Sequence, residues 1–161
     1  MIEDARRADI DDLADLEHLA RQAIDRQRPL RGGLLWSLTL GRQEPLDESL
    51  RRALVDPDQR VVVGTIDGTA IGYGAVRVVG LADGRPLGVV DELFVEPGAR
   101  GVGVGEAMMD LLVAWCTERG CVGIDAVALP GDRDTKNFFE TFGLKARAIV
   151  VHRPLGPSEA P

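Results

Sequence analysis

Residues 89–109 read VVDELFVEPGARGVGVGEAMM and carry the strongest structural signal in the chain. An apolar strand ends at Val95, a Glu-Pro-Gly break follows, and a glycine-rich run from Arg100 to Gly105 opens a helix. The start of a helix presents unpartnered backbone N–H groups and the positive end of the helix dipole, and glycines let a ligand approach closely. The stretch therefore predicts a binding site for a phosphorylated ligand.

The composition indicates one globular domain in a chain of 161 residues, of which 45% are hydrophobic and 28% charged. We expect this domain to span residues 1–153 and to be followed by a frayed tail, 154–161. The N-terminus lacks the apolar core of a signal peptide, and no apolar run is long enough to span a membrane, so we expect a cytoplasmic protein. The two cysteines, Cys116 and Cys121, are expected to be reduced thiols, and they are too few for a metal cage.

The charge balance argues against nucleic acid and anionic membrane surfaces as partners. The chain has 19 Lys and Arg against 26 Asp and Glu, a formal net charge of −7. A negative field repels such polyanions and attracts cations. We therefore expect a cationic partner.

The periodicity of the apolar residues predicts a mixed α/β fold. Helices are predicted over 9–27, 46–55, 103–119 and 134–142, with a short helix or a loop within 30–43. Strands are predicted over 2–5, 61–66, 69–79, 87–95, 121–129 and 144–152, the second and third joined by a hairpin turn at Asp67-Gly68. This order indicates a central sheet with both antiparallel and parallel pairs, flanked by helices. The one clear parallel crossover links 87–95 to 121–129, so a ligand is expected beyond the carboxyl ends of these strands.

Two blocks of sequence resemble the GNAT acetyltransferase superfamily. The first is Arg-Gly-Val-Gly-Val-Gly at 100–105, preceded by Leu-Phe-Val-Glu-Pro at 93–97, and it is similar to the family's pyrophosphate loop and the strand leading to it. The second is KNFFETFGL at 136–144, which resembles the family's last helix. The resemblance covers 60–152 in element order and is looser over the N-terminal helices.

The resemblance implies an N-acetyltransferase that moves an acetyl group from acetyl-CoA, or another short acyl group from its CoA thioester, to a primary amine. The pantetheine arm is expected between the strands ending at Val95 and Leu129, which splay apart in the family. The backbone N–H of Phe94 or Val95 is expected to bind the thioester carbonyl, and Asn137 to contact the CoA arm or the facing strand. Backbone amides implied to hold the pyrophosphate are those of Arg100, Gly101, Val102, Gly103, Val104 and Gly105.

The chemistry of amine attack requires a base, because an amine is mostly protonated at neutral pH. Glu92 is the first candidate, since it stands on the strand expected to carry the thioester and partial burial raises a carboxylate pKa. Asp91 is the second; strand alternation predicts that it faces the opposite side from Glu92, so that only one of them reaches a given site. Alternatively, both are rim carboxylates that make structural hydrogen bonds.

Phe139 stands at the CoA-side position where the family commonly has a tyrosine that protonates the departing thiolate. Tyr73 is the only tyrosine in the chain, and we interpret the glycines on either side of it as sites of close backbone approach or of a bulge. Water is left as a proton source. Alternatively, the chain is a catalytically silent acyl-CoA-binding or protein-interaction module of the same fold.

The sequence lacks residues that two other classes of phosphate-binding protein require. A dinucleotide fingerprint needs a glycine where Glu106 stands, and no Gly-Lys-Ser/Thr follows the turn as in a P-loop. The resemblance implies that the acceptor, a small-molecule or peptide amine, is contacted mainly by residues 9–55. A homodimer formed by pairing of the last strands of two chains is also compatible with the sequence.

Overall fold

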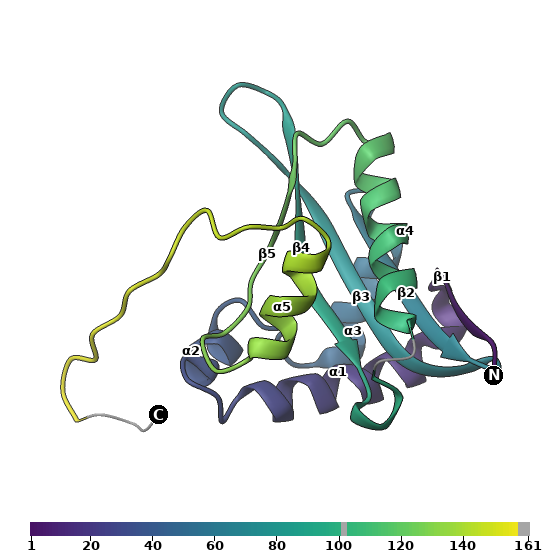
Figure 1. The fold of residues 1–161 in the computed structure, drawn as a ribbon, viewed down its shortest axis with the longest axis horizontal. Helices are drawn as coiled ribbons and strands as arrows, with labels where there is room; N and C mark the ends of the chain where they lie inside the picture. Colours follow the sequence, from purple (N-terminus) through teal and green to yellow (C-terminus); the bar gives the residue numbers. More distant parts are fainter. Residues whose placement is uncertain (101–102, 158–161) are drawn as a thin grey trace.

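The structure is a computed structural model that describes residues 1–100 and 103–157. Its centre is a five-stranded sheet of order β1-β2-β3-β4-β5 (Figure 1). Neighbouring strands are antiparallel except for β4 and β5, which are parallel. The predicted mixed, mostly antiparallel α/β sheet is therefore confirmed. The strands are β1 (Glu3–Arg7), β2 (Gln59–Ile66), β3 (Thr69–Gly80), β4 (Pro86–Val95) and β5 (Ile124–Ala126).

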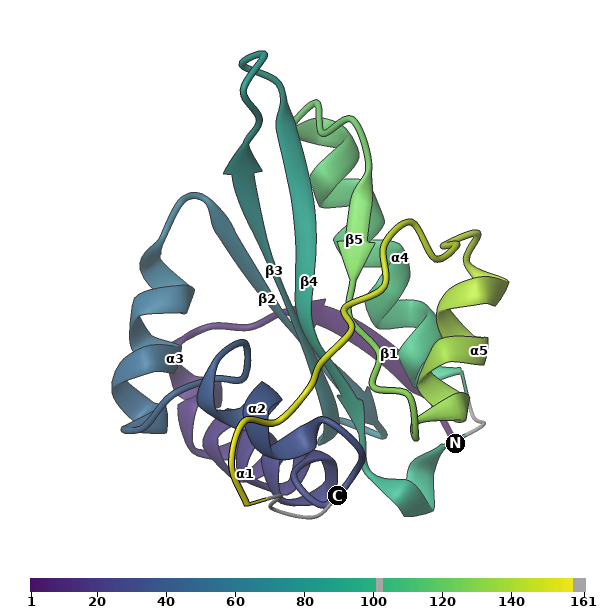
Figure 2. The ribbon, with the colours of Figure 1, turned by 90° about the vertical axis from the view of Figure 1, so that its left-hand side faces the viewer.

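Helices cover both faces of the sheet, with α1 to α3 on one face and α4 and α5 on the other (Figure 2). Alternation along β2 serves both layers, because Val61 and Val63 pack in the cluster with α1 and α3 while Val62 packs in the cluster with α4. None of the helices described is long and apolar enough to cross a membrane. The helices are η1 (Ile10–Asp12), α1 (Leu13–Gln27), α2 (Gly33–Leu38), α3 (Leu46–Val55), η2 (Pro97–Ala99), α4 (Val104–Glu118) and α5 (Arg133–Thr141).

The predicted hairpin between β2 and β3 is confirmed. Ile66 pairs with Thr69, which leaves a two-residue turn at Asp67 and Gly68. Both turn residues have positive φ angles, 48° and 82°, as the predicted type I′ turn requires.

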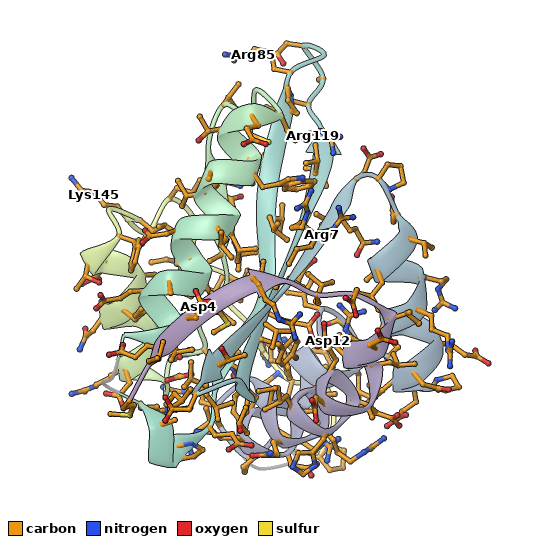
Figure 3. All side chains as sticks on the ribbon, turned by 90° about the vertical axis from the view of Figure 1, so that its right-hand side faces the viewer. Asp4, Arg7, Asp12, Arg85, Arg119 and Lys145 are labelled. Carbon is orange, nitrogen blue, oxygen red and sulfur yellow. The ribbon has the colours of Figure 1, made fainter. Side chains whose placement is uncertain are left out.

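A buried ion pair fixes the entry into α1. Asp12 is 6% exposed and accepts hydrogen bonds from the Arg6 guanidinium at 2.7 and 2.8 Å and from Asp9 N at 2.8 Å. The hydrogen bonds from Arg6 are the main reason that the pKa of Asp12 lies below its ordinary value. Figure 3 shows Asp12 between β1 and the helical layer, so this pair ties the first strand to the first helix.

Both cysteines are free thiols, as the sequence predicts. Cys116 belongs to α4 and is buried, and this burial raises the pKa of its thiol to about 12. Cys121 is partly exposed.

Two strand predictions need correction. The strand predicted over 121–129 is limited to β5, because β4 offers pairing partners only from Gly88 to Val90. The strand predicted over 144–152 is absent, and the chain after α5 runs outward without helix or strand (Figures 1 and 2). Its apolar run has the composition of a strand, but within the described residues no strand pairs with it.

Candidate active site

The strands β4 and β5 separate at the candidate site. They pair only where Gly88 to Val90 lie opposite Ile124 to Ala126, whereas β4 continues to Val95. Beyond Val90, β4 therefore has β3 on one side and, among the described residues, no strand on the other. The predicted splay of the parallel pair is confirmed (Figure 2). This edge leaves main-chain groups available to an extended ligand.

A β-bulge interrupts β4 at Asp91. Val76 pairs with Val90 and Ala75 pairs with Glu92, so Asp91 is the extra residue. A bulge breaks the alternation of side chains along a strand. Asp91 and Glu92 consequently line one and the same cavity, and the prediction that only one of them could reach a given site is wrong.

The cavity lies where β4 meets helices of both layers. Most of its lining residues are apolar or aromatic, and two carboxylates, Asp91 and Glu92, lie near the splayed edge. Trp36 both lines the cavity and packs against the core cluster of α1 and α3. The lining residues are Ala23, Ile24, Gln27, Trp36, Tyr73, Val90, Asp91, Glu92, Leu93, Phe94, Val127, Thr135 and Phe139.

Glu92 is fixed in a buried hydrogen-bond network. Arg42 Nε lies 3.0 and 3.1 Å from its two carboxylate oxygens, and the Arg42 NH2 group makes a further bond to Oε1. The Tyr73 hydroxyl donates to Oε2 at 2.5 Å, and Arg42 also donates to Ser49 Oγ at 2.8 Å. The side chains of Arg42 and Glu92 are only 9% and 8% exposed. Glu92 is therefore an anchored carboxylate, with its oxygens already accepting hydrogen bonds.

The two partners of Glu92 have shifted pKa values. Burial alone would lower the pKa of Arg42, but the facing Glu92 carboxylate outweighs it, and the net shift is upward. Burial raises the pKa of Tyr73 well above its ordinary value, and the negative charge of Glu92 adds to this effect. Arg42 thus stays charged and Tyr73 keeps its proton.

Asp91 is more accessible than Glu92 and has a different environment. Its side chain is 26% exposed and accepts one hydrogen bond from Arg77 Nε at 2.8 Å. Burial raises the pKa of Asp91, while the positive charge of Arg77 opposes that shift. A carboxylate with a raised pKa at the edge of a cavity is suited to accept a proton.

Helix α4 begins with an open N-terminus. Its N-cap residue, Gly103, has a left-handed φ of 86°, and no described side chain caps the helix. The first intrahelical bond runs from Ala107 N to Gly103 O at 3.0 Å. A residue with a Cβ would be strained at this left-handed φ, so the position favours glycine. The uncapped N–H groups fit a phosphate group.

The remaining residues of the predicted pyrophosphate loop differ in how the structure places them. Val104 is 1% exposed, so only its backbone can meet a ligand. An added Cβ at Gly105 would lie 3.7 Å from Val95 Cγ2, which places the start of α4 beside the end of β4. Gly101 and Val102 lie outside the described residues.

The direction of the β4 amides distinguishes Val95 from Phe94. Glu96 N donates to Ile71 O of the β3 side at 2.9 Å. Because successive amides of a strand point to opposite sides, the N–H and C=O of Val95 point toward the splayed edge and those of Phe94 toward β3. The Arg100 side chain supports this orientation, since its Nε donates to Val95 O at 3.1 Å.

Helix α5 places its two predicted residues differently. Asn137 is exposed on the helix surface, whereas Phe139 is 7% exposed and lines the cavity. The Asp132 side chain caps this helix, accepting from Thr135 N at 3.2 Å. Phe139 thus presents an apolar ring at the place where the family resemblance leads one to expect a hydroxyl.

Sequence reasoning missed Arg42 and the contact of Tyr73 with Glu92. The glycine beside Tyr73 was interpreted correctly, since a Cβ at Gly72 would lie 2.7 Å from Phe94 O. Arg42 lies 50 positions from Glu92 in a stretch without clear periodicity, so no local signal pointed to the pair. The one available hint was that a carboxylate buried on a strand, such as Glu92, requires a cationic partner.

Comparison with known proteins shows which family the chain resembles. Residues 29–144 match the sequence model described as the acetyltransferase (GNAT) family. A curated relative, the aminoglycoside N(6')-acetyltransferase type 1 of Stenotrophomonas maltophilia, is 27% identical over 122 residues, which cover 71% of this chain and 79% of the relative.

Solved structures share the fold. The structure of AAC(6')-Iy, an aminoglycoside N-acetyltransferase, in complex with the bisubstrate analogue CoA-S-monomethyl-acetylneamine has a TM-score of 0.73 at 19% identity, covering 96% of this chain and 99% of that one. The ribosomal-protein-alanine N-acetyltransferase from Brucella melitensis biovar Abortus 2308 has a TM-score of 0.69 at 18% identity, covering 96% and 100%. At these identities the likeness establishes the fold.

Proposed function

Because the chain belongs to the acetyltransferase (GNAT) family, we propose that it transfers an acetyl group from acetyl-CoA to the primary amine of a small cationic molecule. The observation that carries this proposal is the position of Asp91, a carboxylate with a raised pKa, in the cavity beside the splayed edge of β4. The open start of α4 adjoins the same edge. The site for acetyl-CoA, at the start of α4, and the site for the amine, in the cavity with Asp91, are thus assigned to neighbouring positions along β4.

The donor is assigned to the α4 start and the β4 edge. When bound, acetyl-CoA supplies an activated acetyl group and a thiolate leaving group. The backbone N–H groups at the start of α4, those of Gly103, Val104 and Gly105, are assigned to its pyrophosphate, because they lie at the positive end of the helix dipole. The Val95 N–H, directed toward the gap, donates to the thioester oxygen and stabilises the negative charge that develops there. Asn137 is exposed on α5 and is assigned to the CoA arm.

Asp91 is assigned as the general base. Its carboxylate takes a proton from the ammonium group of the acceptor, so that the nitrogen lone pair can attack the thioester carbon. Burial raises the pKa of Asp91 toward the working range, which makes it a better proton acceptor than an ordinary aspartate. The hydrogen bond from Arg77 orients it.

Glu92, the first candidate from the sequence, is assigned a positioning role. Both of its oxygens already accept hydrogen bonds from Arg42 or Tyr73, and its charge faces the buried Arg42 guanidinium. The network instead joins Glu92 of β4 to Arg42 in the segment before α3, and Arg42 in turn to Ser49 in α3. Glu92 therefore holds the wall of the acceptor cavity.

The acceptor is proposed to be a small molecule carrying more than one amine. Asp91 and Glu92 give the cavity two carboxylates, and the chain has a net charge of −7. A polycation is attracted by such a field. The curated relative whose name specifies an aminoglycoside acceptor supports the same class.

The test begins with binding. We expect isothermal titration to show binding of acetyl-CoA, and a thiol-release assay to show turnover with at least one amine from a panel of aminoglycosides and polyamines. Absence of binding at high micromolar acetyl-CoA contradicts the proposal. Binding without turnover on any amine indicates the catalytically silent module instead.

The assignment of the base is tested by Asp91→Asn. We expect a loss of about 10²–10⁴-fold in kcat and disappearance of the acid limb of the kcat/KM profile, because the amide cannot accept the proton. Asp83→Asn is the matched control, since Asp83 is also paired with an arginine, Arg85, but at the tip of the β3–β4 hairpin (Figure 3). An unchanged profile in the Asp91 variant would remove Asp91 from the mechanism.

A further inference from the structure

Two arginines lie close together near the C-terminal end of α4, the end opposite to the proposed CoA site. Arg60 is on β2, and its guanidinium carbon lies 5.6 Å from the centroid of the Trp115 ring of α4. Arg7 is the last residue of β1 and is exposed (Figure 3). Trp115 lies about 16 Å along the helix from Val104, the first residue of α4. The two arginines are therefore separate from the start of this helix.

The register of the sheet places both side chains on the same face. Arg7 pairs with Val62, and Val62 packs in the cluster with α4, so Arg7 also faces α4. Arg60 precedes Val62 by two positions on β2 and faces the same side. Arg7 and Arg60 are thus diagonal neighbours across two strands, a relation in which long side chains reach one another.

Both arginines lack a carboxylate partner in the part of the chain that the structure describes. Within residues 1–100 and 103–157, no ion pair includes Arg7 or Arg60. Among the same residues, Arg60 Nε is buried without a hydrogen-bond partner, while the terminal nitrogens of Arg60 are not enclosed in this way. Arg119 differs, although its guanidinium also lies near Trp115, because it donates to Pro57 O and Asp58 Oδ1, both at 2.5 Å. Arg7 and Arg60 thus have N–H donors to offer to a ligand.

The electrostatics of Arg60 indicate a positive charge that its surroundings do not balance. Burial lowers the pKa of Arg60, and the charge of Arg7 lowers it further. The carboxylate of Glu118, on α4, acts in the opposite direction, but the net shift is downward. Two neighbouring like charges repel each other, and an anion between them removes this repulsion.

The chemistry of two guanidinium groups favours a phosphate over a carboxylate. A guanidinium presents a planar fork of N–H donors, and one fork is enough to hold both oxygens of a carboxylate. A phosphate monoester has three terminal oxygens and a charge of about −1.5 to −2 at neutral pH, so it can accept from two forks and balance both charges. The Trp115 ring restrains the Arg60 guanidinium, which lowers the entropy lost on binding.

We propose that Arg7 and Arg60 form an anion site, separate from the start of α4, that binds the phosphate group of a small molecule between the two guanidinium groups. Terminal N–H groups of both arginines donate to the phosphate oxygens. Glu118 weakens the attraction, because its negative charge acts on Arg60. The site depends neither on acetyl-CoA binding nor on acetyl transfer.

An NMR titration of the full chain tests the site directly. Inorganic phosphate and phenyl phosphate are added at constant ionic strength, with chloride as the reference anion. We expect saturable shifts of the amide signals of Arg7 and Arg60 and of the Trp115 indole N–H. Saturation by free phosphate, by the ester or by both supports the site, and their relative affinities tell which form it prefers. Absence of saturable shifts with both compounds at high millimolar concentration would overturn the proposal.

Variants of the two arginines test their roles. Arg7→Gln should raise the dissociation constant at least about tenfold, because the charge-assisted hydrogen bonds from Arg7 are lost. Arg60→Gln should have the same effect, and if it unfolds the domain, Arg7→Gln remains as the test because Arg7 is exposed. Glu118→Gln should tighten binding. Unchanged affinity in Arg7→Gln would overturn the proposal.

The matched control is Arg51→Gln, on α3. Arg51 is exposed, and no ion pair of the described residues includes it, so the variant removes an equivalent charge elsewhere. It should leave phosphate affinity unchanged. An equal loss in Arg51→Gln would indicate a general effect of net charge and would overturn the proposal.

Two further arms define the ligand and the place of binding. Benzoate should bind at least about tenfold more weakly than phenyl phosphate, and equal affinity would contradict the assignment to phosphate. Shifts confined to the amides of Val104 and Gly105 would mean that phosphate binds only at the start of α4, and would also overturn the proposal. Because acetyl-CoA is absent from this titration, a failure of the proposed acetyl transfer leaves its result unaffected.

Discussion

Replacing Arg42 by alanine should destabilise the domain far more than removal of an ordinary ion pair. Arg42 and Glu92 are 9% and 8% exposed, and Arg42 donates three of the four hydrogen bonds that Glu92 receives. After the substitution, the buried carboxylate would keep only the bond from Tyr73. The charge would then lie in the core without its counter-charge.

The expected loss follows from that geometry. Removing one partner of a buried ion pair costs about 3–5 kcal/mol, because the remaining charge stays desolvated. The double variant Arg42→Met/Glu92→Met removes both charges and should cost less than the sum of the two single changes. We expect a coupling energy of about 2–3 kcal/mol from the resulting cycle. The Tyr73 hydroxyl loses its acceptor in the double variant, so part of the cost remains.

Urea unfolding at pH 7, followed by tryptophan fluorescence, measures these free energies. Arg85→Ala is the matched control, because Arg85 also pairs with a carboxylate but both side chains are at least half exposed. It should leave the unfolding midpoint unchanged. A loss below about 1 kcal/mol for Arg42→Ala, or additive single changes, would refute the view of the network as a buried anchor.

Three further predictions follow from other parts of the fold. Asp12→Asn should destabilise the protein at neutral pH, because the charged carboxylate of Asp12 accepts the hydrogen bonds from Arg6. In unfolding curves measured at decreasing pH, the difference in unfolding free energy between this variant and the unmodified protein should vanish as the pH falls through the lowered pKa of Asp12. Gly103→Ala should cost about 1–2 kcal/mol in thermal unfolding and weaken CoA binding in titration, since residue 103 is left-handed. Iodoacetamide should modify Cys121 before Cys116 in peptide mass spectra, because Cys116 is buried and its pKa is raised to about 12.

Local chemistry explains which elements could be predicted from the sequence. The hairpin at Asp67-Gly68 and the helix after the glycine run depend on residues adjacent in sequence, and both lie where the pattern predicts. The bulge at Asp91 has no glycine or proline to mark it, and it arises from the pairing of β4 with β3. The missing last strand has strand composition, but composition cannot provide a partner.

The candidate site likewise has one part that could be predicted from the sequence and one part that could not. The uncapped start of α4 was predictable because its N–H groups and its glycine belong to one short stretch. The proposed preference for Asp91 over Glu92 as the base was not predictable, since it depends on Arg42 and Tyr73, which lie 50 and 19 positions from Glu92. A base is selected by what surrounds each carboxylate, and those surroundings are assembled only by the fold.

The proposed mechanism has no side-chain acid for the departing thiolate, and the geometry is consistent with this. Phe139 lines the cavity but has no proton to donate. Tyr73 also lines it, yet its hydroxyl donates to Glu92 at 2.5 Å, and burial raises its pKa well above the ordinary value. A thiol has an ordinary pKa of about 8.5, so its thiolate is stable enough near neutral pH to leave first and take a proton from water afterwards. In the proposed mechanism the cavity side chains therefore serve a single proton transfer, from the acceptor amine to Asp91, and activity is expected to depend on the raised pKa of Asp91.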